Sequence, residues 1–469
     1  MGRKRKPQHQ QQVAITGIAD KGRGVGRTPE GQVVFVENVA PGDVVDVLVT
    51  RKKSGHLLAV PTHFHQYSTD RVEPFCSHYE VCGGCQWQHL SYTAQLKHKE
   101  NNVRDALQRI AKVSIGEFLP ILPAPETQYY RNKLEFAFSN RRWLTHQELA
   151  DQSAPLFVDV LGFHKAGAFD KIINIDHCWL EPEPSNAIRN GLRELGIEQG
   201  LSFYDTRANQ GLLRQVMIRV STLGETLVLL SFGEEDAARR IAYLDAVLTR
   251  FPQITTLIYC INTKVNDFVG DLDMHTYAGK GYIEEQIGHV RFRIGPKSFF
   301  QTNSRQGERL YAVAAEFAGL NGSQNVYDLY TGVGSIALYL ARDSKQVTGI
   351  EEIEAAIDDA RENARLNQID NCTFYAGDVK DILTPEFAQK HGKPDVVITD
   401  PPRAGMHGDV VKLFLQLESP RIVYVSCNPA TQARDLNLLS EKYSVEKVQP
   451  VDMFPHTQHI EAVALLTKR

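Results

Sequence analysis

The stretch NVYDLYTGVGSIALYLAR, residues 325–342, decides the class of fold that this sequence encodes. Its first part predicts a buried strand, TGVG predicts a tight turn, and the remainder begins a helix. Four further strands follow, separated by helical stretches: KQVTGIEE at 345–352, CTFYAGDV at 372–379, PDVVITDPP at 394–402 and RIVYVSC at 421–427. Strands that alternate with helices predict an α/β domain with a doubly wound, mostly parallel sheet over residues 299–469.

Polar or glycine residues stand at the end of each predicted strand, where ligands of such sheets bind. They are Asp328, Tyr330, Gly332 and Gly334 after the first strand, then Glu351, Asp378, Asp400 and Cys427. The turn lacks the third glycine of a dinucleotide site, whereas S-adenosylmethionine has no phosphate and needs only a close backbone approach. Glu351, 19 residues beyond Gly332, can hold both ribose hydroxyls of either ligand. The pattern favours S-adenosylmethionine and leaves a nicotinamide dinucleotide open.

Cys427 ends the last of these strands in IVYVSCNPATQARDL, residues 422–436. A thiolate can add to carbon 6 of a pyrimidine, which makes carbon 5 nucleophilic enough to attack the methyl group of a sulfonium. A base must then remove the carbon 5 proton, and Glu461 in FPHTQHIEAVALL is the candidate. Either residue alone is more often structural, but their joint occurrence beside a methyl-donor fold favours covalent catalysis.

Length and composition bound the class of protein. At 469 residues the chain is too long for one core, so several domains are expected. No stretch reaches the ~18 apolar residues of a membrane span, and MGRKRKPQHQQQ lacks the apolar core of a secretion signal. We therefore expect a cytoplasmic protein whose seven cysteines are metal ligands or reactive thiols rather than disulfides.

Charge is distributed unevenly along the chain. Residues 1–65 hold ten Lys or Arg against five Asp or Glu, although the whole chain carries a net charge of −4. Residues 1–11 are predicted to form a basic, disordered tail. Short alternating strands over residues 12–66, separated by turns such as KGRGVGR, predict a small β-barrel of the oligonucleotide-binding kind. This basic module is suited to binding a polyanion.

Residues 67–298 are predicted to form a β-rich central domain with a metal site, interrupted by helical stretches at 183–196 and 234–250. Cys76, Cys82 and Cys85 give the spacing C-x5-C-x2-C, and Cys178 is the predicted fourth ligand because the remaining cysteines lie in or after apolar strands. Spacing alone leaves zinc and an iron–sulfur cluster equally open. Arg131, Asn132 and Lys133 are interpreted as surface polarity.

Six motifs in order, SFFQTN, DLYTGVGS, GIEE, DPPRAG, VSCNPAT and HIEAV, together resemble the RNA uracil-5 methyltransferases over nearly the whole chain. With CGGCQWQH and a start similar to a TRAM domain, the chain is similar to the branch that acts on 23S ribosomal RNA. The resemblance implies Cys427 as nucleophile and Glu461 as base. It implies a [4Fe-4S] cluster, rather than zinc, on Cys76, Cys82, Cys85 and Cys178. The methyl-donor contacts that it implies fall on Gln301, Tyr330, Ser335, Glu351, Asp378 and Asp400, next to the glycine turn.

The resemblance further implies that the helical stretch at 91–113 packs on the catalytic domain. The expected protein is a monomer that binds 23S ribosomal RNA, with no membrane partner. Three alternatives stay open: a transfer RNA uracil-5 methyltransferase, an RNA cytosine-5 methyltransferase, and a non-catalytic iron–sulfur protein that binds RNA.

Overall fold

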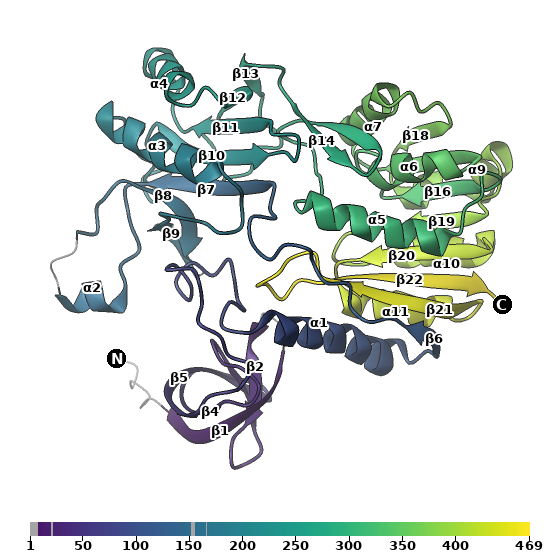
Figure 1. Cartoon of the computed structure of the whole chain (residues 1–469), viewed down its shortest axis with the longest axis horizontal. Helices are drawn as coiled ribbons and strands as arrows, with labels where there is room; N and C mark the ends of the chain where they lie inside the picture. The colour runs from purple at the N-terminus through teal and green to yellow at the C-terminus, as the bar shows by residue number, and fades with distance from the viewer. Residues whose placement is uncertain (1–7, 20–21, 152–154, 166) are drawn as a thin grey trace. The chain divides into compact units, whose positions relative to one another are not determined.

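The structure, a computed structural model, describes residues 8–19, 22–151, 155–165 and 167–469 (Figure 1). The chain divides into two compact units. The first runs to Asn102 and also takes in Phe454–His459, and the second holds Val103–Met453 and Ile460–Arg469. The segment Phe454–His459, which ends two residues before Glu461, therefore belongs to the first unit, while Glu461 itself lies in the second.

A closed five-stranded barrel opens the first unit, with its strands in the order β1-β2-β3-β5-β4. They are β1 (Gln8–Ile18), β2 (Gly24–Arg27), β3 (Val33–Val36), β4 (Val44–Lys53) and β5 (His56–Gln66). Valine, isoleucine, leucine and alanine side chains fill its interior. A Cβ on Gly26 would lie 2.6 Å from the carbonyl oxygen of Ala14, so glycine is needed where β2 meets β1. The predicted barrel is confirmed, but β1 begins at Gln8, inside the predicted tail, and residues 1–7 lie outside the described part of the chain.

An irregular segment, residues 67–91, follows the barrel and carries three of the cysteines. A buried ion pair anchors it. Asp43 is fully buried and accepts hydrogen bonds from Arg71 at 2.8 Å and from the backbone N–H groups of Ala40 at 2.6 Å and Ser68 at 2.8 Å. Removing one partner would leave a buried charge unpaired, so this ion pair fixes where the segment leaves the barrel.

Helix α1 (Tyr92–Ala106) begins in the first unit, which ends at Asn102, and this first part of the helix holds the Phe454–His459 connection. The buried Lys99 ammonium donates to the carbonyl of Phe454 at 2.9 Å, and the backbone N–H of His456 donates to the Gln95 side chain at 2.8 Å. A buried ammonium requires such acceptors. The connection that leads to Glu461 is therefore fixed by polar contacts to α1.

The second unit contains an eight-stranded sheet in the order β18-β17-β16-β19-β20-β22-β21-β6. Its strands are β16 (Asn325–Leu329), β17 (Gln346–Glu351), β18 (Cys372–Ala376), β19 (Val396–Thr399), β20 (Arg421–Ser426), β21 (Tyr443–Val451), β22 (Glu461–Lys468) and β6 (Ile115–Phe118). The first five strands in this order, from β18 through β17, β16 and β19 to β20, run parallel. Strand β22 runs antiparallel to both β20 and β21. The predicted doubly wound, mostly parallel sheet is confirmed.

Helices connect these strands (Figure 1). They are α5 (Ser304–Ala318), α6 (Ser335–Leu340), η3 (Ala341–Asp343), α7 (Glu354–Leu366), α8 (Val379–Ile382), α9 (Pro385–His391), α10 (Gly408–Leu417) and α11 (Pro429–Leu439). The chain moves one way along the sheet through β17 and β18 and the other way through β19 and β20. Since such crossovers are right-handed, reversing direction changes the face that the helices cover.

The segment between α1 and the central domain packs on the eight-stranded sheet. The turn η2 (Leu107–Ala111) follows α1, and Val103, Leu107 and Ala111 lie in one apolar core with α11 and β21. The Asn437 side chain donates to the Ala111 carbonyl at 2.7 Å, and β6 then pairs with β21. Residues 103–118 therefore belong with the eight-stranded sheet, not with the central domain predicted over 67–298.

The central domain is built on a seven-stranded sheet in the order β13-β12-β11-β10-β7-β8-β9. Its strands are β7 (Lys133–Ser139), β8 (Val160–Lys165), β9 (Ala168–Asn174), β10 (Leu213–Val220), β11 (Thr226–Phe232), β12 (Thr256–Ile261) and β13 (His275–Ala278). Helices α3 (Ser185–Glu198) and α4 (Ala237–Arg250) lie at the two predicted helical stretches and share its apolar core. A short helix, α2 (His146–Asp151), also lies in this domain. The hairpin of β14 (Ile283–Ile287) and β15 (Val290–Ile294) packs instead against α7, where the backbone N–H groups of Arg291 and Arg293 donate to the side chains of Asn367 and Asn363 at 2.8 Å. It therefore lies with the eight-stranded sheet and not with the central domain predicted over 67–298.

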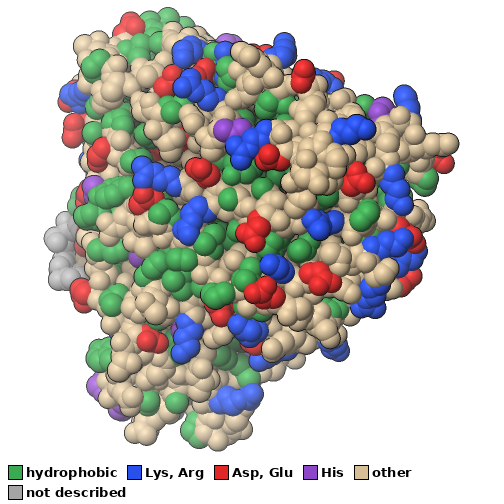
Figure 2. Space-filling view, turned by 45° about the vertical axis from the view of Figure 1, so that its right-hand side comes forward, with side chains coloured by type: hydrophobic (Ala, Val, Ile, Leu, Met, Phe, Trp, Pro, Cys, Tyr) green, Lys and Arg blue, Asp and Glu red, His purple; other side chains and the backbone are tan. Residues whose placement is uncertain are grey.

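On the face shown in Figure 2, Lys and Arg side chains are interspersed with Asp and Glu, so no large area carries one sign of charge. No helix in the described ranges is long and apolar enough to cross a membrane.

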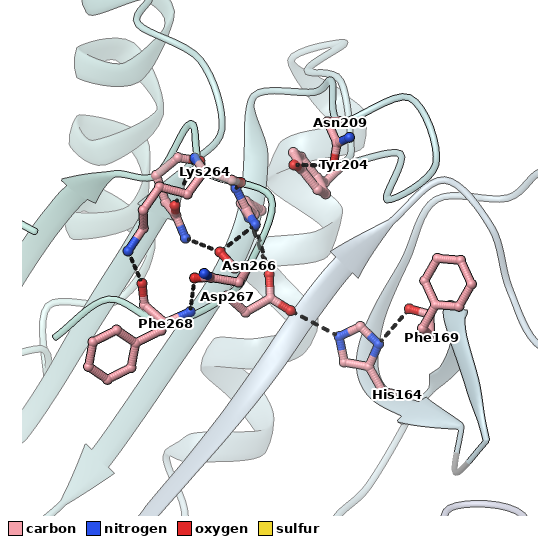
Figure 3. Close-up of polar contacts among 10 residues, drawn as sticks. His164, Phe169, Tyr204, Asn209, Lys264, Asn266, Asp267 and Phe268 are labelled. Atoms are coloured by element: carbon pink, nitrogen blue, oxygen red, sulfur yellow. Dashed lines mark hydrogen bonds and ion pairs between the residues drawn. The ribbon is translucent and has the colours of Figure 1, made fainter. Parts of the chain in front are cut away.

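The loop after β12 is held by polar contacts (Figure 3). Arg214, 2% exposed, donates to the carbonyls of Asn262 at 2.6 Å and Asn266 at 2.8 Å. Asp267 pairs with Arg214 at 3.1 Å and lies 3.6 Å from the His164 ring. The buried guanidinium is thereby satisfied mostly by backbone oxygens, which fixes the loop to the sheet.

Candidate active site

The carboxyl ends of β16 and β19 mark the point where the chain reverses its direction along the sheet, which is where open α/β sheets bind ligands. The backbone after β16 turns sharply there: φ is +63° at Tyr330, +55° at Gly332 and +78° at Gly334. Asp328, 1% exposed, fixes the turn by accepting hydrogen bonds from the Thr331 hydroxyl and, at 3.1 Å, from the backbone N–H of Ala337. A left-handed conformation at a tyrosine is uncommon and costs free energy that these contacts must offset.

A cavity lies over this turn. Five of the predicted donor contacts line it: Gln301, Tyr330, Gly332, Ser335 and Asp400. A Cβ on Gly332 would meet no atom within 4 Å, so the backbone there faces open space and a ligand can approach it closely. The cavity therefore fits S-adenosylmethionine, which needs backbone contact rather than a phosphate site.

The other predicted donor contacts lie outside the cavity lining. Glu351 accepts from the backbone N–H of Gly332 at 3.1 Å, so it supports the turn from the next strand. Asp378 caps α8 and pairs with Lys380, which holds the pKa of this carboxyl below its usual value. Gly334 takes the left-handed conformation at the start of α6, and a Cβ there would press on Ala360 at 3.1 Å.

Cys427 stands where β20 breaks into α11, and the following residues explain the break. Asn428 caps α11 by accepting from the backbone N–H of Ala430 at 3.1 Å, and Pro429 occupies the first turn, where its missing N–H costs nothing. The Asn428 side chain also donates to the Arg403 carbonyl at 2.9 Å. The loop that carries Asp400 and Arg403 is thereby tied to the bend that presents the thiol.

Cys427 and Glu461 come together at the ends of adjacent antiparallel strands. Ser426 pairs with Ala462, and the next residues in the same register are Cys427 and Glu461. Opposite residues of an antiparallel pair have side chains on one face, with Cβ atoms about 5 Å apart. The structure thus brings the two predicted catalytic residues together, with Cys427 half-buried and Glu461 buried.

Electrostatics at this site oppose ionisation of both groups. Burial raises the pKa of the Cys427 thiol to about 11, with further contributions from the negative charges of Glu461 and Asp400. Burial, and then Asp400, raise the pKa of Glu461 well above its usual value. The charge of Arg403 acts in the opposite direction on both groups.

Three residues missed by the sequence analysis belong to the site. Phe299, in the cavity lining, is 74% exposed, although the motif SFFQTN gave no reason to separate it from buried Phe300. Arg403 supplies the positive charge just described. Asn132, interpreted as surface polarity, is 5% exposed and donates to the carbonyl of Gln301 at 2.9 Å and to the Ser304 hydroxyl at 2.8 Å. It therefore fixes the segment that leads into α5.

The four cysteines predicted to bind metal are all half-buried. Cys76, Cys82 and Cys85 lie on the irregular segment of the first unit, and Cys178 lies in the second unit. Gly83 takes a left-handed conformation between them, at φ +77°. Cysteine side chains supply the thiolate ligands that hold iron–sulfur clusters. No group of three Cys, His, Asp or Glu side chains in the described part of the chain is arranged to hold a metal ion.

Two family profiles match the chain, one in its N-terminal part and one in its C-terminal part. The family profile described as tRNA (Uracil-5-)-methyltransferase matches residues 279–469, and the TRAM domain profile matches residues 4–62. The chain is 50% identical to an uncharacterized RNA methyltransferase of Bacteroides thetaiotaomicron over 96% of this chain and all of that protein. It is also 50% identical to an uncharacterized RNA methyltransferase of Porphyromonas gingivalis, over 97% of this chain and 99% of that one.

Among solved structures, the chain is similar to the Pyrococcus abyssi tRNA (uracil-54, C5)-methyltransferase in complex with S-adenosyl-L-homocysteine. The TM-score is 0.76 and the identity 29%, covering 97% of this chain and all of that chain. The cavity at the strand ends and the barrel thus define an S-adenosylmethionine-dependent RNA methyltransferase with a TRAM domain. The chain belongs to the RNA uracil-5 methyltransferase family, which excludes the cytosine-5 and non-catalytic alternatives.

Proposed function

We propose that this protein methylates carbon 5 of a uridine in 23S ribosomal RNA, with Cys427 as the nucleophile and Glu461 as the base. The observation that carries the proposal is the register of β20 and β22, which puts these two side chains opposite each other. The donor cavity and the nucleophile share the loop from Asp400 to Arg403, since Asp400 lines the cavity and Arg403 is bonded to Asn428.

The reaction starts when the Cys427 thiolate bonds to carbon 6 of uracil and the electrons of the 5,6 double bond move onto the carbon 4 carbonyl as an enolate. S-adenosylmethionine, when bound, supplies an electrophilic methyl group on a sulfonium. Carbon 5 takes this methyl group as the sulfur–methyl bond breaks. The Glu461 carboxylate then removes the carbon 5 proton, the 5,6 double bond reforms, and the bond from carbon 6 to sulfur breaks.

Ionisation of Cys427 requires positive charge nearby, because its pKa is about 11 before any ligand binds. Arg403 supplies one such charge, and the N-terminus of α11, which begins two residues after Cys427, supplies a partial one. The raised pKa of Glu461 suits its role as a base, since a carboxylate of higher pKa binds the carbon 5 proton more strongly.

Trapping of the covalent intermediate tests both roles. Glu461→Gln blocks removal of the carbon 5 proton, so a protein–RNA adduct should persist through denaturing electrophoresis after incubation with S-adenosylmethionine. Cys427→Ala should form no adduct and no 5-methyluridine. Methylation by the alanine variant would show that the nucleophile is another group.

The target RNA is the next question, and transfer RNA is the second candidate because the similar Pyrococcus abyssi enzyme is a tRNA (uracil-54, C5)-methyltransferase. Mapping 5-methyluridine in ribosomal and transfer RNA from cells with and without the gene separates the two. We expect loss at a 23S site and an unchanged transfer RNA. The opposite pattern would assign the protein to transfer RNA.

We also propose that Cys76, Cys82, Cys85 and Cys178 hold a [4Fe-4S] cluster in a monomeric, cytoplasmic protein. The support is the C-x5-C-x2-C spacing and the half-buried position of all four cysteines. Anaerobically purified protein should contain iron and acid-labile sulfide in equal amounts, and Cys82→Ser should lower both. Cys372→Ser is the matched control, because Cys372 lies in β18 and should leave the iron content unchanged. Zinc without iron would contradict the proposal.

A further inference from the structure

The donor cavity contains two carboxyl groups and no positive side chain. Asp328 and Asp400 both line it, and its other lining residues are uncharged aromatic, aliphatic and hydroxyl side chains, glycine and glutamine. Buried carboxylates normally have a cationic partner, so a cavity of this composition lacks the charge that would balance it.

Neither carboxyl group has a cationic partner within the described residues. Asp328 is 1% exposed, and both of its hydrogen bonds, from Thr331 and Ala337, go to one oxygen, Oδ2. The Asp400 side chain is half-buried and forms no ion pair in this part of the chain. Without a ligand, protonation is the way in which these carboxyl groups lose their charge, and a bound cation would replace the proton.

We propose that this cavity distinguishes its ligands by the charge on their sulfur atom. Binding of the sulfonium donor releases a proton from the Asp328–Asp400 pair, whereas binding of the uncharged thioether product releases none. The inference rests on the proposed methyl transfer and goes beyond it, because it assigns to two carboxyl groups the distinction between donor and product.

The state of the pair before binding supports this mechanism. Burial raises the pKa of both Asp328 and Asp400 to about 7, and the charge of Asp328 adds to the effect on Asp400. At neutral pH the pair is therefore partly protonated. A cation in the cavity favours the ionised form, so binding lowers both pKa values and expels a proton.

Other charged or titratable groups lie around the pair on every side: Glu351 on β17, Cys372 on β18, Tyr311 on α5, Glu461 on β22, and Cys427 and Arg403 beyond them. Most of them are acidic or neutral. The charge of Glu351 raises the pKa of Asp328 further, and Arg403, the one cation among these groups, forms no ion pair with Asp328 or Asp400 in the described part of the chain.

The pH dependence follows from linkage. Because the free protein binds more protons than the sulfonium complex, donor affinity rises with pH and levels off above the pKa values near 7. The slope is at most about tenfold in Kd per pH unit for each proton released. Affinity for the thioether should be nearly constant over the same range, so the ratio of donor affinity to product affinity should decrease as the pH falls.

Isothermal titration calorimetry tests the inference on the full chain without any RNA. Titrations of S-adenosylmethionine and S-adenosylhomocysteine at pH 7.0 in phosphate and in Tris give the number of protons released, because the two buffers differ in ionisation heat. We expect roughly half a proton or more for the sulfonium and none for the thioether. Between pH 7.5 and 6.0 the Kd of the donor should rise about 3- to 10-fold, and that of the product less than about twofold.

Two substitutions test the assignment to residues. Asp400→Asn removes one carboxyl group at nearly constant shape. It should abolish most of the proton release and reduce the difference between the two ligands in how their Kd depends on pH. Asp381→Asn removes an exposed carboxyl group outside the cavity lining, and it should change neither the proton release nor the pH dependence of Kd for either ligand. Equal proton release for the two ligands, or release unchanged in Asp400→Asn, would overturn the inference. Failure of both ligands to bind at any pH would overturn the proposed function itself.

Discussion

The Cys427 thiol has to ionise in a place that burial and two carboxyl groups make unfavourable, and Arg403 is the side chain whose charge opposes them. Removing that charge should therefore raise the pKa of the thiol further. We predict that Arg403→Gln shifts the pH profile of Cys427 alkylation by iodoacetamide toward higher pH, measured on the Cys427 peptide by mass spectrometry. Methyl transfer should fall roughly 100- to 1,000-fold, the scale of a lost contact to developing charge in a transition state.

The control for this prediction is Arg403→Lys, which keeps the charge and should leave the alkylation profile nearly unchanged. It should still lower methyl transfer somewhat, because an ammonium lacks the planar donors of a guanidinium. An identical alkylation profile in the glutamine variant and the unmodified protein would show that Arg403 does not act on the thiol.

Asp400 gives a prediction about stability at the same scale. Its pKa is raised to about 7 in the folded protein, so the folded state binds more protons than the unfolded state between about pH 4 and pH 7. Stability is therefore lost as the pH rises through this range. Asp400→Asn should stabilise the ligand-free protein by about 2–4 kcal/mol at pH 8 and by almost nothing at pH 4. Denaturant titrations at the two pH values measure this, and a gain independent of pH would contradict it.

At the scale of elements, Asn428 caps the N-terminus of α11 and also links it to the loop that carries Arg403. Asn428 accepts from Ala430 at 3.1 Å and donates to the Arg403 carbonyl at 2.9 Å. Asn428→Asp keeps the cap and loses the donor, so stability should change by less than about 0.5 kcal/mol while kcat falls. Asn428→Ala loses both contacts and should also cost about 1 kcal/mol.

The matched control is Thr384→Ala, which removes a comparable cap, since Thr384 accepts from Phe387 at 3.2 Å at the start of α9. It should cost about 1 kcal/mol with kcat unchanged. Urea denaturation and single-turnover methylation separate the two effects. If Thr384→Ala lowers kcat as much as Asn428→Asp, the loss comes from stability and not from the loop contact.

The elements that the sequence predicts well are those whose signal is local. Strand ends such as Asp400 and Cys427 could be assigned together because a parallel sheet brings all carboxyl ends to one edge. Strand β6 was missed because it has four residues and pairs with β21, more than 300 positions later. The sequence does not distinguish an exposed Asn132 from the buried one that the structure shows, because a polar residue at a strand start has the same pattern whether it faces water or a buried carbonyl.

At the scale of the whole molecule, charge is divided between the parts of the chain. The chain carries −4 overall, the face in Figure 2 shows interspersed signs, and residues 1–65 are basic. Arg51, Lys52 and Lys53 lie exposed at the end of β4, where Lys52 and Lys53 extend the pairing with β5. Since phosphate contacts dominate RNA affinity and make it depend on salt, the barrel should supply a large share of this term.

We predict that replacing Arg51, Lys52 and Lys53 together by Gln weakens RNA binding at all salt concentrations. The slope of log K against log salt should become shallower by about 2, because each single-strand phosphate contact contributes about 0.7. The control is the triple Gln substitution of Lys345, Lys390 and Lys393, which are exposed in the catalytic domain and change the net charge equally. Filter binding of labelled ribosomal RNA fragments between 50 and 300 mM salt, about the range over which such slopes are resolved, measures both. Equal losses of RNA affinity in the two variants would show that total charge, and not the barrel, governs RNA binding. Unchanged affinity for S-adenosylmethionine in both variants would confirm that the methyl-donor cavity does not depend on these surface charges.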